Sequence, residues 1–457
     1  MALVTQRRSS GGGGLKRVLA IVVVGGLVML AVVGARELRL PPPAAVELVA
    51  DKPAIGRKTI VSVSASEPTL GVESVTVTAD GAGLRNKPLA AGAGDVAVGK
   101  EAFPELVPGK LTITVTVQAR GTRLRRPDPV VVTKTFDVRL DPPSLAASSQ
   151  FIYITQGGVE AVVYDVGATA VKDGVQAGGW FFPGYALPGG APTQRFAFFA
   201  APYDWDGTTE EDARAKILLV AEDDIGNRAE QRFIHKWFPR PMGKDVIELK
   251  EPFMQKVTGE IYSRTPELAK KGDLLADTLQ LNGDLRRKNM AELRALKSQP
   301  KFLWSTTFAP MQNAAVKGSF ADRRTYMHDG QKVDTQDHLG FDLASVEHAS
   351  VQAANAGVVL LARYFGIFGN CVVLDHGYGL MSLYAHLSTI AVKEGEVVAA
   401  GQEIGRTGAT GLAGGDHLHF TMVLDGLPVT PVEWWDAHWI KDRLKLKLGD
   451  ALPWTPK

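Results

Sequence analysis

The arrangement of apolar and polar residues changes three times along the 457-residue chain. An unbroken apolar run near the N-terminus gives way to long stretches in which apolar and polar residues alternate. A segment of helical composition comes next, and short apolar runs separated by glycines fill the last third. A strand alternates its faces with a period of two, whereas a helix repeats about every 3.6 residues. The pattern therefore predicts a mainly β protein with an apolar N-terminal helix and a helical segment between its β regions.

The apolar run Val18–Ala35 contains no charged and no strongly polar side chain. At a rise of about 1.5 Å per residue, a helix of this length nearly spans a hydrocarbon core of about 30 Å. Basic residues precede it, which favours a cytoplasmic N-terminus. We therefore expect a cytoplasmic tail over residues 1–17, a transmembrane anchor over residues 18–35, and export of everything that follows. Two alternatives stay open: a cleaved signal peptide, since Val33-Gly34-Ala35 resembles a cleavage site, and a buried soluble helix.

Alternating β-branched residues predict two β units, over residues 45–141 and 146–238. Gly and Pro turns bound their expected strands, which are 59–64, 75–78, 111–117, 130–140, 151–154, 159–164, 195–199, 215–221 and 232–237. Each unit has the size and the short strands of an immunoglobulin-like β-sandwich domain. In the second, Ile217–Asn227 resembles a late hairpin of bacterial immunoglobulin-like domains. The two units serve either as a spacer that holds a later domain away from the membrane or as binding modules for sugar, wall or partner.

Residues 244–300 have the composition of a helical connector. We expect one helix to open at Pro266–Ala269 and a second to run from Asp284 to Gln299. In the second helix, leucines and a methionine lie broadly on one face and basic residues surround them. Such a helix either presents a solvated face on a connector or touches an anionic wall polymer or lipid.

Charge and cysteine content exclude several classes of protein. Lys and Arg number 51 against 49 Asp and Glu, and a formal net charge of +2 argues against a nucleic-acid partner. A single cysteine, Cys371, excludes an intrachain disulfide framework and any thiolate-rich zinc or iron–sulfur site. All but one of the histidines fall between His328 and His438, so chemistry is expected in the last third of the chain.

Three histidine elements stand in this last third: His338–Asp342, Tyr384–Ser388 and His417–Phe420. On a strand, the two histidines of the last element point to the same side, while the residues next to them enter the core. Imidazole nitrogens and a carboxylate oxygen suit zinc, and three protein ligands leave a fourth position for a water whose pKa falls to around 7. The chain has no HExxH sequence. Histidines must then take the polar catalytic roles, with His386 and one histidine of the last element as candidates.

Residues of about 305–435 resemble the lysostaphin-type (LytM-like) zinc endopeptidases, which cut peptidoglycan peptides. The resemblance lies in motifs that occur in the order typical of that family: HxGxD at His338–Asp342, His376–Gly379 leading to Tyr384–Leu387, Gly395–Gly405, Thr410-Gly411, His417–Phe420 and Asp425–Pro431. It implies a small antiparallel β metallopeptidase domain, expected over residues 303–440, with a groove over the metal. It also implies a substrate with glycine bridges or D-amino-acid cross-links.

The same resemblance implies the roles of five residues. Zinc is held by His338, Asp342 and His419, while His386 and His417 bind and orient the attacking water or stabilise the tetrahedral oxyanion. Many relatives have lost ligands and only activate other wall hydrolases. All five residues are present in this chain, which favours an active enzyme.

Two residues near the last motif depart from the family. Asp416 precedes His417 and would raise its pKa if the carboxylate pointed inward, and Thr421 stands where relatives often have Glu. The loop Thr325–Asp337 lies next to the first ligand and could cover the metal. The other histidines of this region and the cysteine are expected in surface, turn or core positions: His328, His348, His376, His438 and Cys371.

The sequence thus predicts a single-pass protein of the cell membrane whose bulk is periplasmic or extracytoplasmic. Its expected activity is that of a Zn2+-dependent endopeptidase that hydrolyses peptide cross-links of peptidoglycan by attack of a zinc-bound water. The expected partners are peptidoglycan peptides, the membrane through the N-terminal helix, and wall or hydrolase partners through the β units; no nucleic acid is expected. One alternative is a non-enzymatic wall-binding scaffold or activator of other wall hydrolases. Another is a zinc protease that acts on protein substrates.

Overall fold

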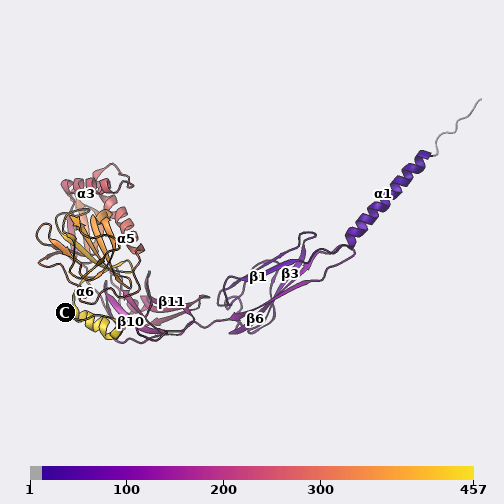
Figure 1. Cartoon of the computed structure of the whole chain (residues 1–457), viewed down its shortest axis with the longest axis horizontal. Coiled ribbons are helices and arrows are strands. Elements are labelled where there is room, and N and C mark those ends of the chain that lie inside the picture. Colours follow the sequence, from indigo (N-terminus) through magenta and orange to yellow (C-terminus); the bar gives the residue numbers. More distant parts are fainter. Residues whose placement is uncertain (1–12, 457) are drawn as a thin grey trace, which may run out of the picture. The chain divides into compact units, whose positions relative to one another are not determined.

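The computed structural model describes residues 13–456, which form parts of two compact units (Figure 1). The first unit comprises the chain up to Asp141 together with Asp224–Asn227. The second comprises Pro142–Asp223 and the chain from Arg228 onward. Most of the regular structure in the described residues is β, which confirms the predicted fold class.

The apolar N-terminal run forms helix α1 (Gly13–Leu38). Its stretch Arg17–Leu38 has a mean hydropathy of 2.9 and is long enough to cross a membrane. None of this stretch is buried inside the structure, so a buried soluble helix finds no support. A signal sequence meets the same criteria of length and composition. Most of the predicted cytoplasmic tail, residues 1–12, lies outside the described residues.

The rest of the first unit is a sandwich of two sheets. One sheet has the order β1 (Ala45–Ala50), β2 (Ile60–Ser66), β5 (Gly94–Ala97), and the other has the order β4 (Leu84–Ala91), β3 (Val72–Gly81), β6 (Gly109–Ala119), β7 (Val130–Val138). On β6 every second residue from Leu111 to Val117 is fully buried, while the threonines between them are partly exposed. One face of each sheet therefore enters a shared core, as the period-two pattern predicted.

A second pair of antiparallel sheets opens the second unit. Their strand orders are β13 (Tyr185–Ala186), β14 (Gln194–Ala200), β10 (Val159–Val166), β8 (Leu145–Ala147) and β12 (Trp180–Pro183), β11 (Ala170–Ala177), β15 (Ile217–Asp223), β16 (Arg228–Arg232). Beside them, β17 (Lys236–Phe238) pairs in parallel with β9 (Tyr153–Thr155). Helix α2 (Glu210–Lys216) takes the first residues of the strand predicted over 215–221, because a capping box between Thr209 and Asp212 starts a helix there.

The helical segment differs from the prediction at its first helix. Helix α3 (Glu251–Arg264) ends before Pro266, and α4 (Leu274–Gln280) begins well after it. The prediction of a helix that opens at Pro266–Ala269 is therefore wrong. Proline lacks the N–H that continues a helix, and here it follows the end of one. The second prediction is confirmed in part, since the π-helical turn η1 (Leu281–Leu285) and α5 (Arg286–Ala295) cover most of residues 284–299.

A large sheet forms the centre of the C-terminal part. Its strand order is β19 (Ala315–Gly318), β22 (Phe341–Ala344), β30 (Leu418–Leu424), β26 (Leu380–Leu387), β25 (Asn370–Gly377), β24 (Gly357–Tyr364), β28 (Val397–Val398), and β31 (Leu427–Val429) pairs with β30. On β25, Cys371 and Val373 belong to the core formed with the helical segment, while Val372 and Leu374 belong to the core on the other face. Burial on both faces explains why these strands read as continuous apolar runs.

Smaller elements complete the second unit. One sheet has the order β18 (Lys244–Glu248), β20 (Asp322–His328), β21 (Gln331–His338), with β18 parallel to β20, and another has the order β23 (Ser350–Gln352), β29 (Glu403–Arg406), β27 (Thr389–Ile390). Short helical turns are η2 (Gly366–Phe368), α6 (Val432–Trp435), α7 (Ala437–Trp439), η3 (Ile440–Lys445), α8 (Leu446–Leu448) and η4 (Gly449–Ala451). Figure 1 shows the C-terminal turns beside β10, which α8 contacts.

The second sandwich and the large sheet share one hydrophobic core. The ring of Phe196 lies 5.9 Å from that of Phe302 and 4.9 Å from that of Tyr378, and Phe198 meets Trp434 at 6.4 Å. The boundaries at 146–238, 244–300 and 303–440 remain predictions. The aromatic core joins the second β unit to the C-terminal part. It therefore favours the interpretation of this β unit as a fixed support for the C-terminal sheet over its interpretation as a spacer that moves freely.

His376 lies in this core, and its pKa makes the second unit sensitive to acid. The side chain is fully buried, with Nδ1 2.8 Å from the carbonyl oxygen of Ala356 and Nε2 2.7 Å from Oγ of Ser382. Burial lowers its pKa from 6.5 to about 4. Between these pH values the unfolded chain binds the proton and the folded chain does not. The stability that His376 confers is therefore complete above pH 6.5 and is lost as the pH falls toward 4.

We expect acidification from pH 7 to pH 5 to lower the free energy of unfolding by roughly 2 kcal/mol through His376 alone. His376→Gln removes this part of the pH dependence, whereas the same change at the exposed His438 retains it. Denaturant unfolding followed by tryptophan fluorescence measures the effect, because every tryptophan of the chain lies beyond residue 142. Equal pH dependence in the wild type and both variants would contradict this expectation.

Candidate active site

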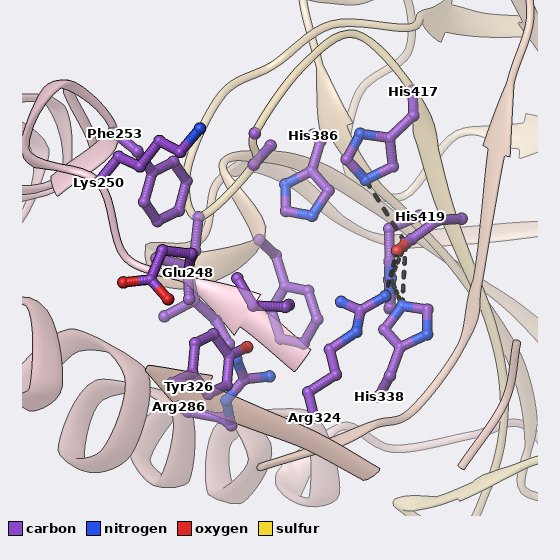
Figure 2. Close-up of a pocket in the computed structure, with 17 residues that line it drawn as sticks. Glu248, Lys250, Phe253, Arg286, Arg324, Tyr326, His338, His386, His417 and His419 are labelled. Carbon is purple, nitrogen blue, oxygen red and sulfur yellow. Dashed lines mark hydrogen bonds and ion pairs between the residues drawn. The ribbon is translucent and has the colours of Figure 1, made fainter. Parts of the chain in front are cut away.

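The three histidine elements meet where neighbouring strands of the large sheet lie beside the end of β21, a strand of the small sheet with β18 and β20. His338 ends β21, Asp342 lies in β22 and His419 in β30, and these last two residues face each other in the register of the two strands. His386 lies near the end of β26, the strand on the other side of β30, and His417 directly precedes β30. All five side chains predicted from the sequence are therefore brought together, and Figure 2 shows the four histidines among them.

Three of them form a tight, buried cluster. Nε2 of His338 lies 2.9 Å from Oδ1 of Asp342 and 3.0 Å from Nδ1 of His419, and the same carboxylate oxygen lies 3.0 Å from that Nδ1. Each residue is at most 9% exposed. One ligand atom from each of the three residues can thus reach a single metal ion.

Each of these two histidines has one ring nitrogen that points away from the cluster. The hydrogen bonds of these nitrogens show whether the cluster fits a cation. Nδ1 of His338 lies 2.9 Å from the carbonyl oxygen of Ser319, which only accepts, so Nδ1 carries the proton and Nε2 keeps its lone pair. Nε2 of His419 lies 3.0 Å from Oγ1 of Thr421, whose own proton goes to the carbonyl of Leu339 at 2.8 Å. Nδ1 of His419 therefore also keeps its lone pair. Electron-pair donors this close repel one another unless a proton or a cation lies between them, and three donors around one point suit a metal ion.

Thr421, noted above as a departure from the family, thus has a structural role. Its hydroxyl links the ring of His419 to the backbone of the first motif. The glycine of HxGxD is required by the same contact, because a Cβ on Gly340 would lie 2.5 Å from Oγ1 of Thr421 and 2.6 Å from Nε2 of His419.

His386 and His417 face the cluster from the side of the cavity (Figure 2). Nδ1 of His386 lies 2.8 Å from the carbonyl oxygen of Thr410, and Nδ1 of His417 lies 2.8 Å from that of Gly415. Because carbonyl oxygens only accept, both neutral rings turn an unprotonated Nε2 inward. The two rings are 4.9 Å apart, and Nε2 of His417 lies 3.4 Å from Oδ1 of Asp342. His386 adopts a left-handed backbone with φ of 62°, the kind of strain that functional sites retain.

Protein charges set the protonation of the cluster. Burial opposes ionisation of Asp342, but its contacts with His338, His417 and His419 outweigh burial and hold its pKa far below the usual value. Burial lowers the pKa of His419 to about 4, and burial with neighbouring histidine charges lowers that of His386 well below 6.5. For His417, the hydrogen bond and charge of Asp342 outweigh burial and raise the pKa.

Asp416 points away from the cluster. One of its carboxylate oxygens accepts a hydrogen bond of 2.5 Å from the hydroxyl of Thr407, and the other accepts one of 3.2 Å from the backbone N–H of His348. From the sequence, Asp416 would raise the pKa of His417 only if its carboxylate pointed inward. The carboxylate points away, so Asp416 does not have this effect. The raised pKa of His417 comes from Asp342 instead.

A cavity of about 380 Å³ opens beside the histidines (Figure 2). Its opposite wall comes from β18 and the start of α3, with Arg286 of α5 below; Ile367, Phe368 and Leu412 add apolar surface. The segment 325–337, expected as a loop that could cover the metal, is mostly the β20–β21 hairpin and contributes Tyr326 to the wall. The wall residues of β18, α3 and α5 could not be singled out from the sequence, because they come from the segment interpreted as a connector.

Residues 336–431 match the model of Peptidase family M23. The C-terminal sheet belongs to an M23 peptidase domain. This confirms the predicted resemblance to the lysostaphin-type, LytM-like peptidases at the C-terminus.

Two curated proteins and a solved structure extend the comparison. The chain is 30% identical over 193 residues to the peptidoglycan DD-endopeptidase ShyA of Vibrio cholerae, covering 41% of this chain and 41% of that protein. It is 40% identical over 95 residues to the DD-carboxypeptidase/endopeptidase Mpg of Neisseria meningitidis, covering 21% and 22%. The catalytic domain of lysostaphin from Staphylococcus simulans aligns at 23% identity and a TM-score of 0.21, covering 32% of this chain and 96% of that one. The chain thus spans less than half the length of the curated relatives it matches.

Helix α3, outside the matched residues, holds a loop of the M23 domain. Nζ of Lys256 donates to the carbonyls of Ala409 and Ala413 at 2.5 and 2.9 Å, and Oε1 of Glu260 accepts from the N–H of Gly411 at 2.8 Å. The carbonyl that binds His386 lies between these contacts, and the loop leads directly to His417. The predicted connector therefore fixes the segment that orients both inner histidines.

We expect Lys256→Met and Glu260→Gln each to lower kcat about 10- to 100-fold and to leave the bound metal in place, since they hold the residues on either side of Thr410, whose carbonyl binds His386. Lys256→Arg should recover part of the loss, and Lys297→Met, an exposed lysine of the same segment, should match the wild type. Peptidase kinetics and metal analysis of the purified variants measure both quantities. Wild-type kcat in both variants would show that the loop needs no support from α3.

Proposed function

We propose that this chain is a membrane-anchored, exported zinc endopeptidase that hydrolyses peptide cross-links of peptidoglycan. The observation that carries the proposal is the convergence of His338, Asp342 and His419, two of them with their lone pairs fixed inward, beside two further inward-facing histidines. The M23 domain and its similarity to peptidoglycan DD-endopeptidases support the reaction class.

The donor set favours zinc over other metals. Two imidazole nitrogens and one carboxylate oxygen suit zinc, whereas Mg2+ and Ca2+ prefer oxygen ligands throughout. His338, Asp342 and His419 would hold the ion, which when bound supplies a Lewis acid and lowers the pKa of a ligated water. The carbonyl of Ser319 and the hydroxyl of Thr421 would keep both rings in the ligating tautomer.

The two inner histidines, His386 and His417, would accept and donate the protons that move during the hydrolysis. Nε2 of His386, with its Nδ1–H held by the carbonyl of Thr410, accepts a proton from the attacking water and orients that water. His417 would act in its protonated form, which the raised pKa beside Asp342 favours, and its Nε2–H would donate to the carbonyl oxygen of the scissile amide as negative charge develops there. Together the two residues position the water and stabilise the oxyanion.

Helix α1 supports the anchored location. With its basic flank in the cytoplasm, the helix would place the chain that follows it on the outer side of the membrane, where peptidoglycan lies. Wall or hydrolase partners would bind through the sandwich of the first unit, which includes no residue of the cavity.

Purified peptidoglycan sacculi test the proposal. The detergent-solubilised full chain should release soluble peptide fragments from them, a chelator should stop the release, and zinc should restore it. Release only when a second wall hydrolase is present would instead favour the activator alternative. No release with zinc bound, across sacculi of several chemistries, would defeat the proposal.

A further inference from the structure

We propose that the first unit binds the headgroups of anionic phospholipids through the arginine loop (residues 120–126, between β6 and β7) together with the end of α1. The inference rests on the membrane anchoring proposed above. It adds a second contact with the membrane, made by a folded β unit and separate from the active site.

Two hydrogen bonds tie the arginine loop to the end of the anchor. Oγ1 of Thr122 donates to the carbonyl oxygen of Glu37 at 2.5 Å, and the backbone N–H of Arg123 donates to Oε2 of Glu37 at 2.7 Å. Glu37 lies in the last turn of α1, and the helix and the loop belong to the same compact unit. The loop is therefore held where the helix ends.

The depth of this contact follows from the length of the apolar run. Glu37 comes two residues after Ala35, the last residue of the run, which is about 3 Å along the helix axis. The polar headgroup layer begins at the edge of the hydrocarbon core and is roughly 5–7 Å thick. When α1 spans the membrane, the arginine loop therefore lies among the headgroups.

The charge at this end of the unit is positive. Six exposed arginines gather in the loop and at the end of α1: Arg36, Arg39, Arg120, Arg123, Arg125 and Arg126. Arg126 forms an ion pair with Glu73 at 3.0 Å. The guanidinium groups of Arg120, Arg123 and Arg125 form no hydrogen bond or ion pair with any residue that the structure describes. A guanidinium fork matches the oxygens of a phosphate, so these three groups suit phospholipid headgroups.

The nearby carboxylates do not neutralise these guanidinium groups. Glu37 accepts the N–H of the loop, and Glu73 is paired with Arg126. Glu67 is buried, and its oxygens accept the backbone N–H groups of residues 69–71 at 2.5–2.9 Å. Basic residues beside a membrane-spanning helix are attracted by the negative surface potential of anionic lipids.

Leu124 adds an apolar side chain at the tip of the loop. It is 66% exposed and stands between Arg123 and Arg125. A single exposed leucine needs no explanation in itself. Between two arginines and beside the end of an anchor, however, it has the pattern of a membrane interface, in which apolar side chains enter the lipid and basic ones bind headgroups.

The loop is held in shape before it meets a lipid. Oγ1 of Thr122 accepts the backbone N–H of Arg125 at 3.0 Å, and Nε2 of Gln118 donates to the carbonyl oxygen of Pro127 at 2.9 Å. A Cβ on Gly121 would lie 2.5 Å from the carbonyl oxygen of Arg125, so the turn is tight. Binding then orders little additional backbone, which keeps its entropic cost low.

Lipid contact of the loop tip tests the inference. The full chain is reconstituted in vesicles of phosphatidylcholine, either alone or with phosphatidylglycerol as about one third of the lipid. A fluorophore is attached to Leu124→Cys, while the natural Cys371 is fully buried and stays unlabelled. Quenching by a spin-labelled lipid should be at least about twofold stronger with phosphatidylglycerol, and concentrated salt should remove the difference. Equal quenching in the two kinds of vesicle would overturn the inference.

Charge-matched variants locate the contact. Arg123→Gln combined with Arg125→Gln, introduced beside the label, should lower the quenching to its value in phosphatidylcholine alone. Lys87→Gln combined with Lys110→Gln removes the same charge and should leave the quenching unchanged. Both lysines lie toward the start of β6, roughly 20–30 Å along the strand from the arginine loop. Undiminished quenching in the arginine variant would show that these residues do not bind the headgroups.

Two further measurements separate this inference from the proposed function. An alkaline carbonate wash that strips the chain from both kinds of vesicle would defeat the anchoring and the inference with it. A chain that resists the wash but shows equal quenching would keep the anchoring and lose the inference. A lipid-dependent signal in a chain that releases nothing from sacculi would support the inference and defeat the peptidase proposal.

Discussion

His338→Ala is expected to abolish zinc binding and to lower kcat/KM at least about a thousandfold. Nε2 of His338 touches both other donors of the cluster, and its loss leaves only Asp342 and His419. A bound metal contributes several kcal/mol to the stabilisation of the transition state, and about 4 kcal/mol corresponds to a thousandfold in rate. Metal content by mass spectrometry and peptidase kinetics on the same preparation measure the two losses.

A thermal measurement separates loss of the metal from loss of the fold. A ligand that binds only the folded chain raises its melting temperature. The wild type should therefore melt at a higher temperature with zinc than with a chelator, while His338→Ala should melt at one temperature under both conditions. His438→Ala, an exposed histidine outside the site, should behave as the wild type. Stoichiometric zinc in purified His338→Ala would contradict the ligand assignment.

His386→Ala is expected to have the opposite effect on the metal. It should retain zinc and lose about 10²- to 10⁴-fold in kcat with little change in KM, the usual range for removal of a positioned acid or base. His386 contributes no ligand atom to the three-residue cluster, and its Nε2 faces the cavity. Single-turnover cleavage of a fluorescent peptide, with metal analysis in parallel, measures the change.

Comparison of the two variants tests the division of roles. If His386→Ala lost the metal and His338→Ala kept both metal and activity, ligand and proton roles would have to be exchanged. His417→Ala repeats the test at the second inner histidine. In the wild type, Nε2 of His417 lies 3.4 Å from Asp342, and the residue does not belong to the three-residue cluster. We expect this variant to resemble His386→Ala.

The five residues that meet in the site could be predicted from the sequence because each lies in or beside a strand with a short motif. Alternation along β30 places His417 and His419 on one side, and Leu418 and Phe420 are buried as that alternation requires. The glycine of the first motif also has a local reason, since the ring of His419 fills the space of its missing side chain.

The other wall of the cavity could not be predicted in this way. Arg286 and Lys256 look like residues of a solvated basic helix, and nothing local in the sequence distinguishes them from exposed neighbours such as Lys297. The role of Lys256 arises from its contacts with the carbonyls of Ala409 and Ala413, more than 150 residues away in the chain, and Arg286 lines a cavity whose other walls come from distant segments. Periodicity reports which face of a helix is buried, but not which distant loop meets it.

The error at Pro266 has a similar origin. Proline is common both at the first position of a helix and shortly after the end of one, so its presence marks a boundary without giving its direction. Here α3 ends at Arg264, and the following helix starts with Asp273 as its N-cap. The shared aromatic core was likewise beyond local patterns, because Phe196 packs against Phe302, which lies more than 100 residues further along the chain.

Cleavage of a defined muropeptide dimer by the purified full chain tests the peptidase function most directly. With zinc bound, mass spectrometry should show the dimer replaced by two fragments whose summed mass exceeds that of the dimer by one water, as hydrolysis of a single cross-linking amide requires. An intact dimer after prolonged incubation, in a preparation that holds zinc at His338, Asp342 and His419, would contradict it.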